Sequence, residues 1–131
     1  MKSLLRWLFP LIFCLSAVAA QANWISYSQP TFDKLQDDGK PILVLVHASW
    51  CPTCRAQAPI ISSLLSQKEY QGITALRVDF DTQKDVVRAF RVPMQSTLIV
   101  FTGGKEVGRS TGDTTKVGIK ALLQKALKVS P

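Results

Sequence analysis

Residues 42–54 read ILVLVHASWCPTC, a continuous apolar run followed closely by a Cys-x-x-Cys motif. The five aliphatic residues 42–46 predict a strand that is covered on both faces, as in a parallel or mixed central sheet. Pro52 suits the first position of a helix, where its missing N–H is not needed. This stretch therefore predicts a strand, a short loop and a helix that begins around Cys51 and carries Cys54 one turn later.

Further elements are expected on both sides of this stretch. Before it, a short helix can be capped by Thr31 and end at Gly39. After it, residues 73–80 predict a second strand. Asp81 or Thr82 can then cap another helix. The order up to this point is one leading helix followed by a strand, a helix, a strand and a helix.

The last third of the sequence predicts a hairpin and a final helix. Residues 97–101 predict a third strand, and the turn sequence TGGK at residues 102–105 leads to a short fourth strand around Val107. Asp113 or Thr114 can cap the last helix, whose apolar residues recur at i, i+3, i+4, i+7 and i+8. These residues are Ile119, Leu122, Leu123, Ala126 and Leu127. The chain is therefore expected to fold as an α/β protein.

The N-terminal segment has the three zones of a secretory signal peptide. A positively charged start precedes residues 7–20, which are uncharged and mostly apolar. This stretch is shorter than the roughly 20 residues that a membrane-spanning helix needs. We therefore expect a signal peptide over residues 1–22, cleaved after Ala22 or Ala20, one folded domain over residues 23–131, and a periplasmic or otherwise exported protein. An uncleaved N-terminal anchor is the alternative.

Chain length and charge restrict the remaining function classes. Removing 22 of the 131 residues leaves a chain of single-domain size. The formal net charge is +7, from 16 Lys and Arg against 9 Asp and Glu. The basic residues are scattered and lack the aromatic interleaving of single-strand binders, which indicates solvated helix faces and no nucleic-acid partner.

The cysteines carry the most specific chemical signal. Of the three, Cys14 lies in the predicted signal peptide, so the exported chain keeps only Cys51 and Cys54. The first sulfur of such a motif lies at a helix N-terminus, where unpaired N–H groups and the helix dipole favour an anion. This setting lowers a thiol pKa and makes the thiolate that attacks disulfides. Cys51 is therefore expected to attack, Cys54 to resolve the mixed disulfide, and Trp50 to shield the pair and contact an incoming chain.

The region from Phe32 to Leu127 resembles the thioredoxin-fold family. The matching features are ASWCPTC at residues 48–54, Pro59 inside the helix, VDFD at residues 78–81, the strand at residues 97–101 and Gly112. The resemblance implies a central mixed four-stranded sheet flanked by helices in a single domain. It also implies a thiol-disulfide oxidoreductase with no cofactor beyond the redox-active Cys51–Cys54 disulfide, acting on protein disulfides or thiols.

Two further details of the resemblance concern the direction of the reaction. The Cys-Pro-Thr-Cys motif is similar to that of exported thioredoxins of cytochrome c maturation, which act as reductants. Gly39-Lys40-Pro41 resembles the C-terminal domain of the transmembrane disulfide reductases. We therefore expect a periplasmic reductant that a membrane thiol reductant recharges.

Some positions depart from the family pattern. Leu45 stands where the family usually carries a buried Asp, six residues before Cys51. His47 stands at a commonly aromatic position, where it could handle protons near neutral pH or simply pack in the strand. Arg77 matches a family lysine beside the active site, although a surface charge would fit equally well.

The largest departure concerns the cis-proline that the family places opposite the cysteines. Ser96 occupies that position, and Pro93 comes three residues earlier. A non-proline cis peptide costs about 2.5–4 kcal/mol, so a trans or strained peptide is expected if Ser96 faces the sulfurs. Its N–H and hydroxyl could then stabilise a thiolate, and Gln95 and Ser96 would contact substrates together with Pro52 and Thr53. A loop rearrangement could instead bring Pro93 to the site.

Other functions remain open on the same residues. Two thiolates make half of a tetrahedral zinc or iron–sulfur site. Only His47 could add a soft ligand, so such a metal site would need a dimer or an outside ligand. A disulfide-introducing oxidase and a module that docks unfolded proteins are further alternatives. Thiolate stability and the resupply partner set the direction of exchange.

Overall fold

A five-stranded mixed sheet organises residues 24–128, the part of the chain that this computed structural model describes. The elements in chain order are β1 (Ile25–Ser26), α1 (Gln29–Asp37), β2 (Ile42–His47), α2 (Pro52–Leu65), the short 3-10 helix η1 (Lys68–Tyr70), β3 (Thr74–Asp79), α3 (Lys84–Ala89), β4 (Thr97–Thr102), β5 (Lys105–Thr111) and α4 (Lys116–Leu127). The predicted signal peptide and its cleavage sites after Ala20 or Ala22 lie outside the described residues. Within residues 24–128, no helix is both long and apolar enough to cross a membrane.

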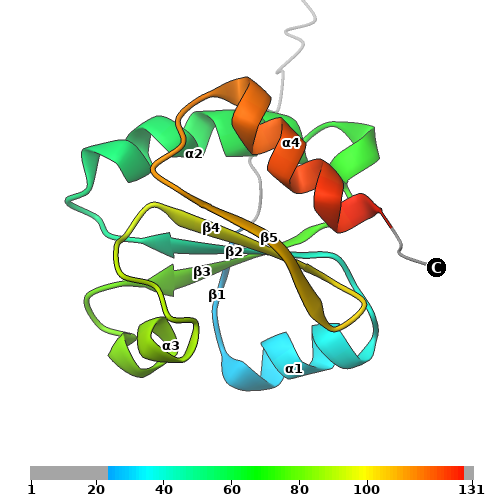
Figure 1. Ribbon diagram of the computed structural model, residues 1–131, viewed down its shortest axis with the longest axis horizontal. Coiled ribbons are helices and arrows are strands. Elements are labelled where there is room, and N and C mark those ends of the chain that lie inside the picture. Colours follow the sequence, from blue (N-terminus) through cyan, green and yellow to red (C-terminus); the bar gives the residue numbers. More distant parts are fainter. Residues whose placement is uncertain (1–23, 129–131) are drawn as a thin grey trace, which may run out of the picture.

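The strand order in the sheet is β1-β3-β2-β4-β5. β3 pairs parallel with both β1 and β2, while β4 pairs antiparallel with β2 and β5. Helices α2 and α4 cover one face of the sheet, and α1 and α3 lie on the other (Figure 1). The mixed sheet flanked by helices is confirmed, but the expected number of four strands is wrong. β1 was missed because two exposed residues carry no recognisable periodicity.

The central strand β2 explains why the apolar run is continuous. Leu43 and Leu45 belong to the core under α2 and α4, whereas Ile42, Val44 and Val46 belong to the core on the side of α1 and α3. All five side chains are 2% exposed or less. Because both faces of β2 are covered by helices, an alternating pattern would have buried polar groups.

Two helix caps differ from those expected. α1 begins after Ser28, whose Oγ accepts a hydrogen bond from the Thr31 N–H at 3.3 Å, so Thr31 is not the cap. α4 begins after Thr115, whose Oγ1 accepts from the Gly118 N–H at 3.1 Å. Asp113 instead accepts hydrogen bonds from the Thr115 N–H and hydroxyl. Several capping residues stand together in each segment, and the turn geometry selects one of them.

The turn between β3 and α3 also differs. α3 begins after Gln83, which makes no side-chain capping bond, so neither Asp81 nor Thr82 caps the helix. Their N–H groups donate instead to Oδ1 of Asp79, at 2.8 and 3.0 Å. The carboxylate at the end of β3 thus satisfies the backbone of this turn.

Candidate active site

The Cys-x-x-Cys motif lies at the start of α2, directly after the loop that follows β2. Cys51 is the residue before the first helical position, with extended backbone angles, and Pro52 follows inside the first turn. The Cys51 Sγ accepts a hydrogen bond from the Cys54 N–H at 3.1 Å. A sulfur therefore takes the capping role that a Ser or Asp oxygen usually has. The expected helix start at Cys51 is confirmed.

Ser96, from a distant segment, completes the contacts of both sulfurs. Its Oγ lies 3.1 Å from the Cys51 Sγ and 3.3 Å from the Cys54 Sγ. The antiparallel pairing of β2 with β4 brings this about, because Val46 near the end of β2 lies opposite Thr97 at the start of β4. Both cysteines are free thiols and are 1% exposed or less.

The backbone of Ser96 adopts a rare conformation. Its φ is +65°, in the left-handed region, and residues 24–128 contain no cis peptide bond. Its N–H donates to the carbonyl of Val46 at 2.8 Å, and its carbonyl accepts from the Gly112 N–H at 3.0 Å. Pro93 is exposed to solvent. Ser96, with the expected trans peptide, therefore stands at the cysteines, and Pro93 does not.

Gln57 is a site residue that the sequence reasoning missed. Its side chain is fully buried, and its Nε2 donates to the carbonyls of Ser96 at 3.2 Å and Asp113 at 2.9 Å. Its Oε1 has no hydrogen-bond partner among the described residues. A polar residue in helical register with Ile61 and Leu64, which are buried, was the signal in the sequence.

The two thiols have opposite pKa shifts. Burial raises the pKa of Cys51, but hydrogen bonds from the Cys54 thiol, the Ser96 hydroxyl and the N–H groups of Cys54 and Thr53 outweigh burial and lower the pKa. Burial raises the pKa of Cys54, and its hydrogen bond to Cys51 raises it further. The arrangement therefore favours a thiolate at Cys51 beside a protonated Cys54.

Leu45 and His47 occupy the last part of β2. Leu45 is packed in the core, so no carboxylate lies at this position. His47 is half-buried and lies opposite Asp79 of β3 in the sheet register. Burial lowers the pKa of His47 and the positive charge of Arg77 lowers it further, while Asp79 partly opposes both effects. No hydrogen bond within residues 24–128 joins His47 to a cysteine sulfur.

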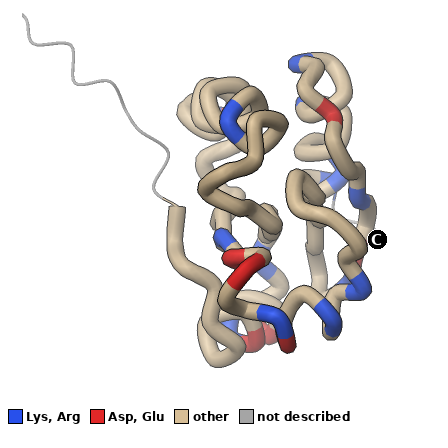
Figure 2. The backbone as a smooth tube through the Cα atoms, turned by 90° about the vertical axis from the view of Figure 1, so that its left-hand side faces the viewer, with Lys and Arg blue, Asp and Glu red and all other residues tan. Residues whose placement is uncertain are grey.

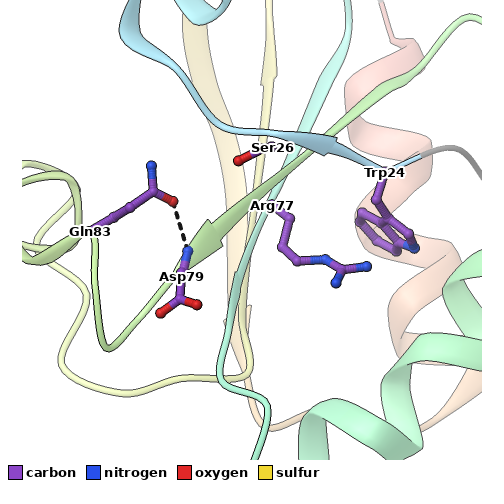
Figure 3. A pocket seen from close by; sticks show the side chains of 5 residues that line it. All are labelled: Trp24, Ser26, Arg77, Asp79 and Gln83. Carbon is purple, nitrogen blue, oxygen red and sulfur yellow. Dashed lines mark hydrogen bonds between the residues drawn. The ribbon is translucent and has the colours of Figure 1, made fainter.

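Arg77 belongs to a separate pocket of about 310 Å³ at the edge of the sheet. The guanidinium carbon Cζ of Arg77 lies 5.5 Å from the centre of the Trp24 ring, which is a cation–π contact. Ser26, Asp79 and Gln83 complete the lining (Figure 3). None of these residues contacts a cysteine sulfur by hydrogen bond.

Two large exposed apolar side chains, Trp50 and Met94, lie close in the chain to Cys51 and Ser96. Trp50 is 54% exposed, and its Nε1 donates to Oδ2 of Asp81 at 2.8 Å. Met94, which the sequence reasoning did not single out, is 53% exposed. Of the other candidate contact residues, Pro52 is exposed, while Thr53 and Gln95 are half-buried.

Charges and possible metal ligands are dispersed in the described part of the chain. The Lys and Arg positions lie at separate places along the backbone, interspersed with Asp and Glu (Figure 2). Among residues 24–128, no group of three or more His, Cys, Asp or Glu side chains is placed to hold a metal ion.

Comparison with known proteins agrees with this geometry. The family model described as Thioredoxin matches residues 23–125. A thioredoxin from Mycobacterium tuberculosis is 34% identical over 92 residues, which are 70% of this chain and 76% of that protein. The bifunctional thioredoxin reductase/thioredoxin of Mycobacterium leprae is 34% identical over 88 residues, 67% of this chain but only 19% of that protein. The crystal structure of Trxlp from Edwardsiella tarda superposes with a TM-score of 0.75 at 39% identity, covering 77% of this chain and 98% of that one.

Proposed function

We propose that this chain, which belongs to the thioredoxin family and is a thiol-disulfide oxidoreductase, reduces protein disulfides in the periplasm or another exported location. The observation that supports disulfide exchange, in either direction, is the environment of Cys51. Its sulfur stands at the N-terminus of α2 and lies within hydrogen-bond distance of the Cys54 N–H and the Ser96 hydroxyl. These contacts favour the thiolate that disulfide exchange requires.

The proposed reaction has two steps. The Cys51 thiolate attacks one sulfur of the substrate disulfide, forming a mixed disulfide and releasing the other sulfur as a thiolate. Cys54, one helical turn away and fully buried, then attacks the Cys51 Sγ. The second substrate sulfur leaves, and the protein ends as a Cys51–Cys54 disulfide. Two electrons thus pass to the substrate, and a membrane thiol reductant restores the dithiol.

Substrate contact is proposed for the surface around the sulfurs. Trp50 offers a flat apolar surface, and Pro52 and Thr53 stand in the first turn of α2. Gln95 and Ser96 lie in the segment before β4, and the Ser96 Oγ lies within hydrogen-bond distance of both sulfurs. Because both sulfurs are buried, a substrate chain has to lie closely against these residues to reach Cys51.

Two similarities support the reducing direction of exchange, and one observation favours the oxidising direction. The Cys-Pro-Thr-Cys motif is similar to that of exported reductants, and the relatives are thioredoxins. A second candidate, a disulfide-introducing oxidase, is favoured by the lowered pKa of Cys51, because a stabilised thiolate stabilises the reduced form. Equilibration of the pair with glutathione tests both. A potential of about −250 mV or below supports the reductant, and one near −120 mV supports the oxidase.

Export is proposed from the signal-peptide pattern of residues 1–22. N-terminal sequencing of the protein recovered from a periplasmic fraction tests it. The mature chain should begin at Asn23 or Gln21. A chain that keeps Met1 in the membrane fraction would support the uncleaved anchor instead.

Metal binding through the same thiols is the alternative outside redox exchange. It would require ligands from a second copy or from solution, since two thiolates fill half of a tetrahedral site. Metal analysis and sulfur-to-metal absorbance of protein purified under reducing conditions distinguish the two functions. Insulin reduction by metal-free protein would exclude the metal as a requirement.

A further inference from the structure

We propose that the Ser96 hydroxyl is a catalytic hydrogen-bond donor that serves the two sulfurs in turn. It stabilises the Cys51 thiolate before the attack and the Cys54 thiolate before the resolving step. The inference rests on the proposed disulfide exchange and assigns a role to a residue that replaces the family's cis-proline.

The distances carry the first part of the argument. The Ser96 Oγ lies within hydrogen-bond distance of both sulfurs, at 3.1 Å from Cys51 and 3.3 Å from Cys54. A hydroxyl has one hydrogen and two lone pairs, and its hydrogen turns toward the better acceptor. With Cys51 as thiolate and Cys54 as thiol, the Ser96 hydroxyl and the Cys54 thiol both donate to the Cys51 sulfur, and the hydroxyl oxygen stays within reach of the Cys54 sulfur.

The burial of Cys54 supplies the second part. Cys54 is fully buried, so its thiolate has almost no contact with solvent. Leu45 occupies the place of the family's buried acid, and burial raises the pKa of Cys54. The resolving sulfur therefore needs a hydrogen-bond donor at the moment it becomes an anion. The Ser96 hydroxyl reaches this sulfur, and the Ala48 N–H is the other hydrogen-bond donor beside it.

The two roles follow each other in the reaction. When Cys51 attacks, its sulfur becomes part of a neutral mixed disulfide, and the hydroxyl loses its anionic acceptor. The proton of Cys54 passes to the thiolate that the substrate released in this step. The hydroxyl then turns to donate to the Cys54 thiolate. Cys54 attacks the Cys51 Sγ, the second substrate sulfur leaves as a thiolate, and it takes its proton from water.

The backbone of Ser96 is held so that only this hydroxyl needs to move. Its N–H is bound by the Val46 carbonyl, and its own carbonyl accepts from Gly112 and from the buried Gln57 amide. These contacts hold the residue at its positive φ with the side chain on the sulfurs. Gln57 acts through Ser96 and is a positioning residue.

A two-phase assay with 5,5′-dithiobis(2-nitrobenzoate) tests the proposal. Attack by Cys51 releases the first coloured thiolate, and resolution by Cys54 releases the second, so stopped-flow absorbance gives both rates. Ser96→Ala removes the hydroxyl but keeps the Cβ, so the variant residue has to adopt the same positive φ as Ser96. Both phases should slow by about tenfold below the thiol pKa values, as for a rise of one pKa unit. The loss should vanish, or reverse slightly, at a pH above both values, because a more basic thiolate is more nucleophilic.

Matched variants make the outcome decisive. Thr97→Val deletes the neighbouring buried hydroxyl, which bonds Met94 and Thr111 rather than sulfur, and should leave both phases within about twofold over the pH range. Cys54→Ser assigns the second phase by removing it. If Ser96→Ala folds poorly, Ser96→Gly removes the hydroxyl while relieving the positive φ.

An unchanged second phase in the Ser96 variant would overturn the shared role. So would a slowing that is equal at every pH. Failure of the wild-type protein to release any coloured thiolate would instead refute the proposed exchange itself. The assay thus separates the role of Ser96 from the function on which it rests.

Discussion

Gln57 and Ser96 are 39 residues apart in the chain, and the Gln57 Nε2 donates to the Ser96 carbonyl at 3.2 Å. The same nitrogen donates to the Asp113 carbonyl at 2.9 Å. Because both partners are carbonyl oxygens, only the NH₂ side of the amide can face them. One side chain thus connects α2 to the segment before β4 and to the loop before α4.

Replacing Gln57 should therefore affect both stability and the thiols. Gln57→Leu removes both hydrogen bonds and leaves the buried Ser96 carbonyl without this donor, at a cost of about 1–3 kcal/mol. Without Gln57 the Ser96 backbone is held less firmly, so its hydroxyl should bond the Cys51 sulfur less well and the pKa of Cys51 should rise. Urea unfolding and the pH profile of Cys51 alkylation measure the two effects. A stability loss with an unchanged alkylation profile would mean that Gln57 does not position Ser96.

Gln57→Glu is the isosteric counterpart of that variant. A carboxylate facing two carbonyls is repelled by them, so the Glu pKa should be raised by the fold. The unfolded chain then releases its proton at lower pH than the folded one, and stability should fall as pH rises above about 4.3. Urea unfolding at acidic and neutral pH checks this. Equal stability loss at both pH values would contradict it.

Asp79 should make the free energy of unfolding depend on pH in the acidic range. Its pKa is lowered, first by the Thr82 N–H and then by the Asp81 N–H, although burial opposes both. A depressed pKa stabilises the fold above the unfolded value of about 3.9, and this stabilisation is lost as pH falls toward the folded value. Asp79→Asn should therefore be less stable than the wild type at pH 7, with a gap that narrows below pH 4. Urea unfolding measures the gap, and the exposed Asp37→Asn should show no comparable pattern.

The Trp50 side chain should distinguish protein substrates from small disulfides. Asp81→Ala removes the acceptor of the indole N–H, while Asp81→Asn keeps an oxygen there. Loss of one exposed hydrogen bond of about 0.5–1 kcal/mol corresponds to a two- to fivefold slower reaction with insulin in the Ala variant. The rate of reaction with 5,5′-dithiobis(2-nitrobenzoate), a small disulfide, should change less. An Asn variant as slow as the Ala variant would show that the hydrogen bond is not what orients Trp50.

Local sequence patterns were sufficient for the elements that hold the motif. The apolar run of β2, the helix start at Cys51 and the apolar stripe of α4 were all predicted. Each depends on neighbours within one or two turns, where periodicity and proline placement report directly on burial and backbone geometry. β1 was too short for such a pattern. The helix caps differed because several capping residues compete within a few positions.

The sequence by itself thus predicted the fold class and the Cys51–Cys54 pair, since the strand and helix patterns and the Cys-x-x-Cys motif are short stretches of contiguous residues. Only the tertiary structure decided what surrounds the sulfurs. Ser96 is 45 residues from Cys51, and it reaches the sulfur because β2 and β4 pair antiparallel. Gln57 interrupts the apolar face of α2, and only the fold places two distant carbonyls opposite its amide. Hydrogen bonds between segments depend on three-dimensional register, which a one-dimensional pattern does not contain.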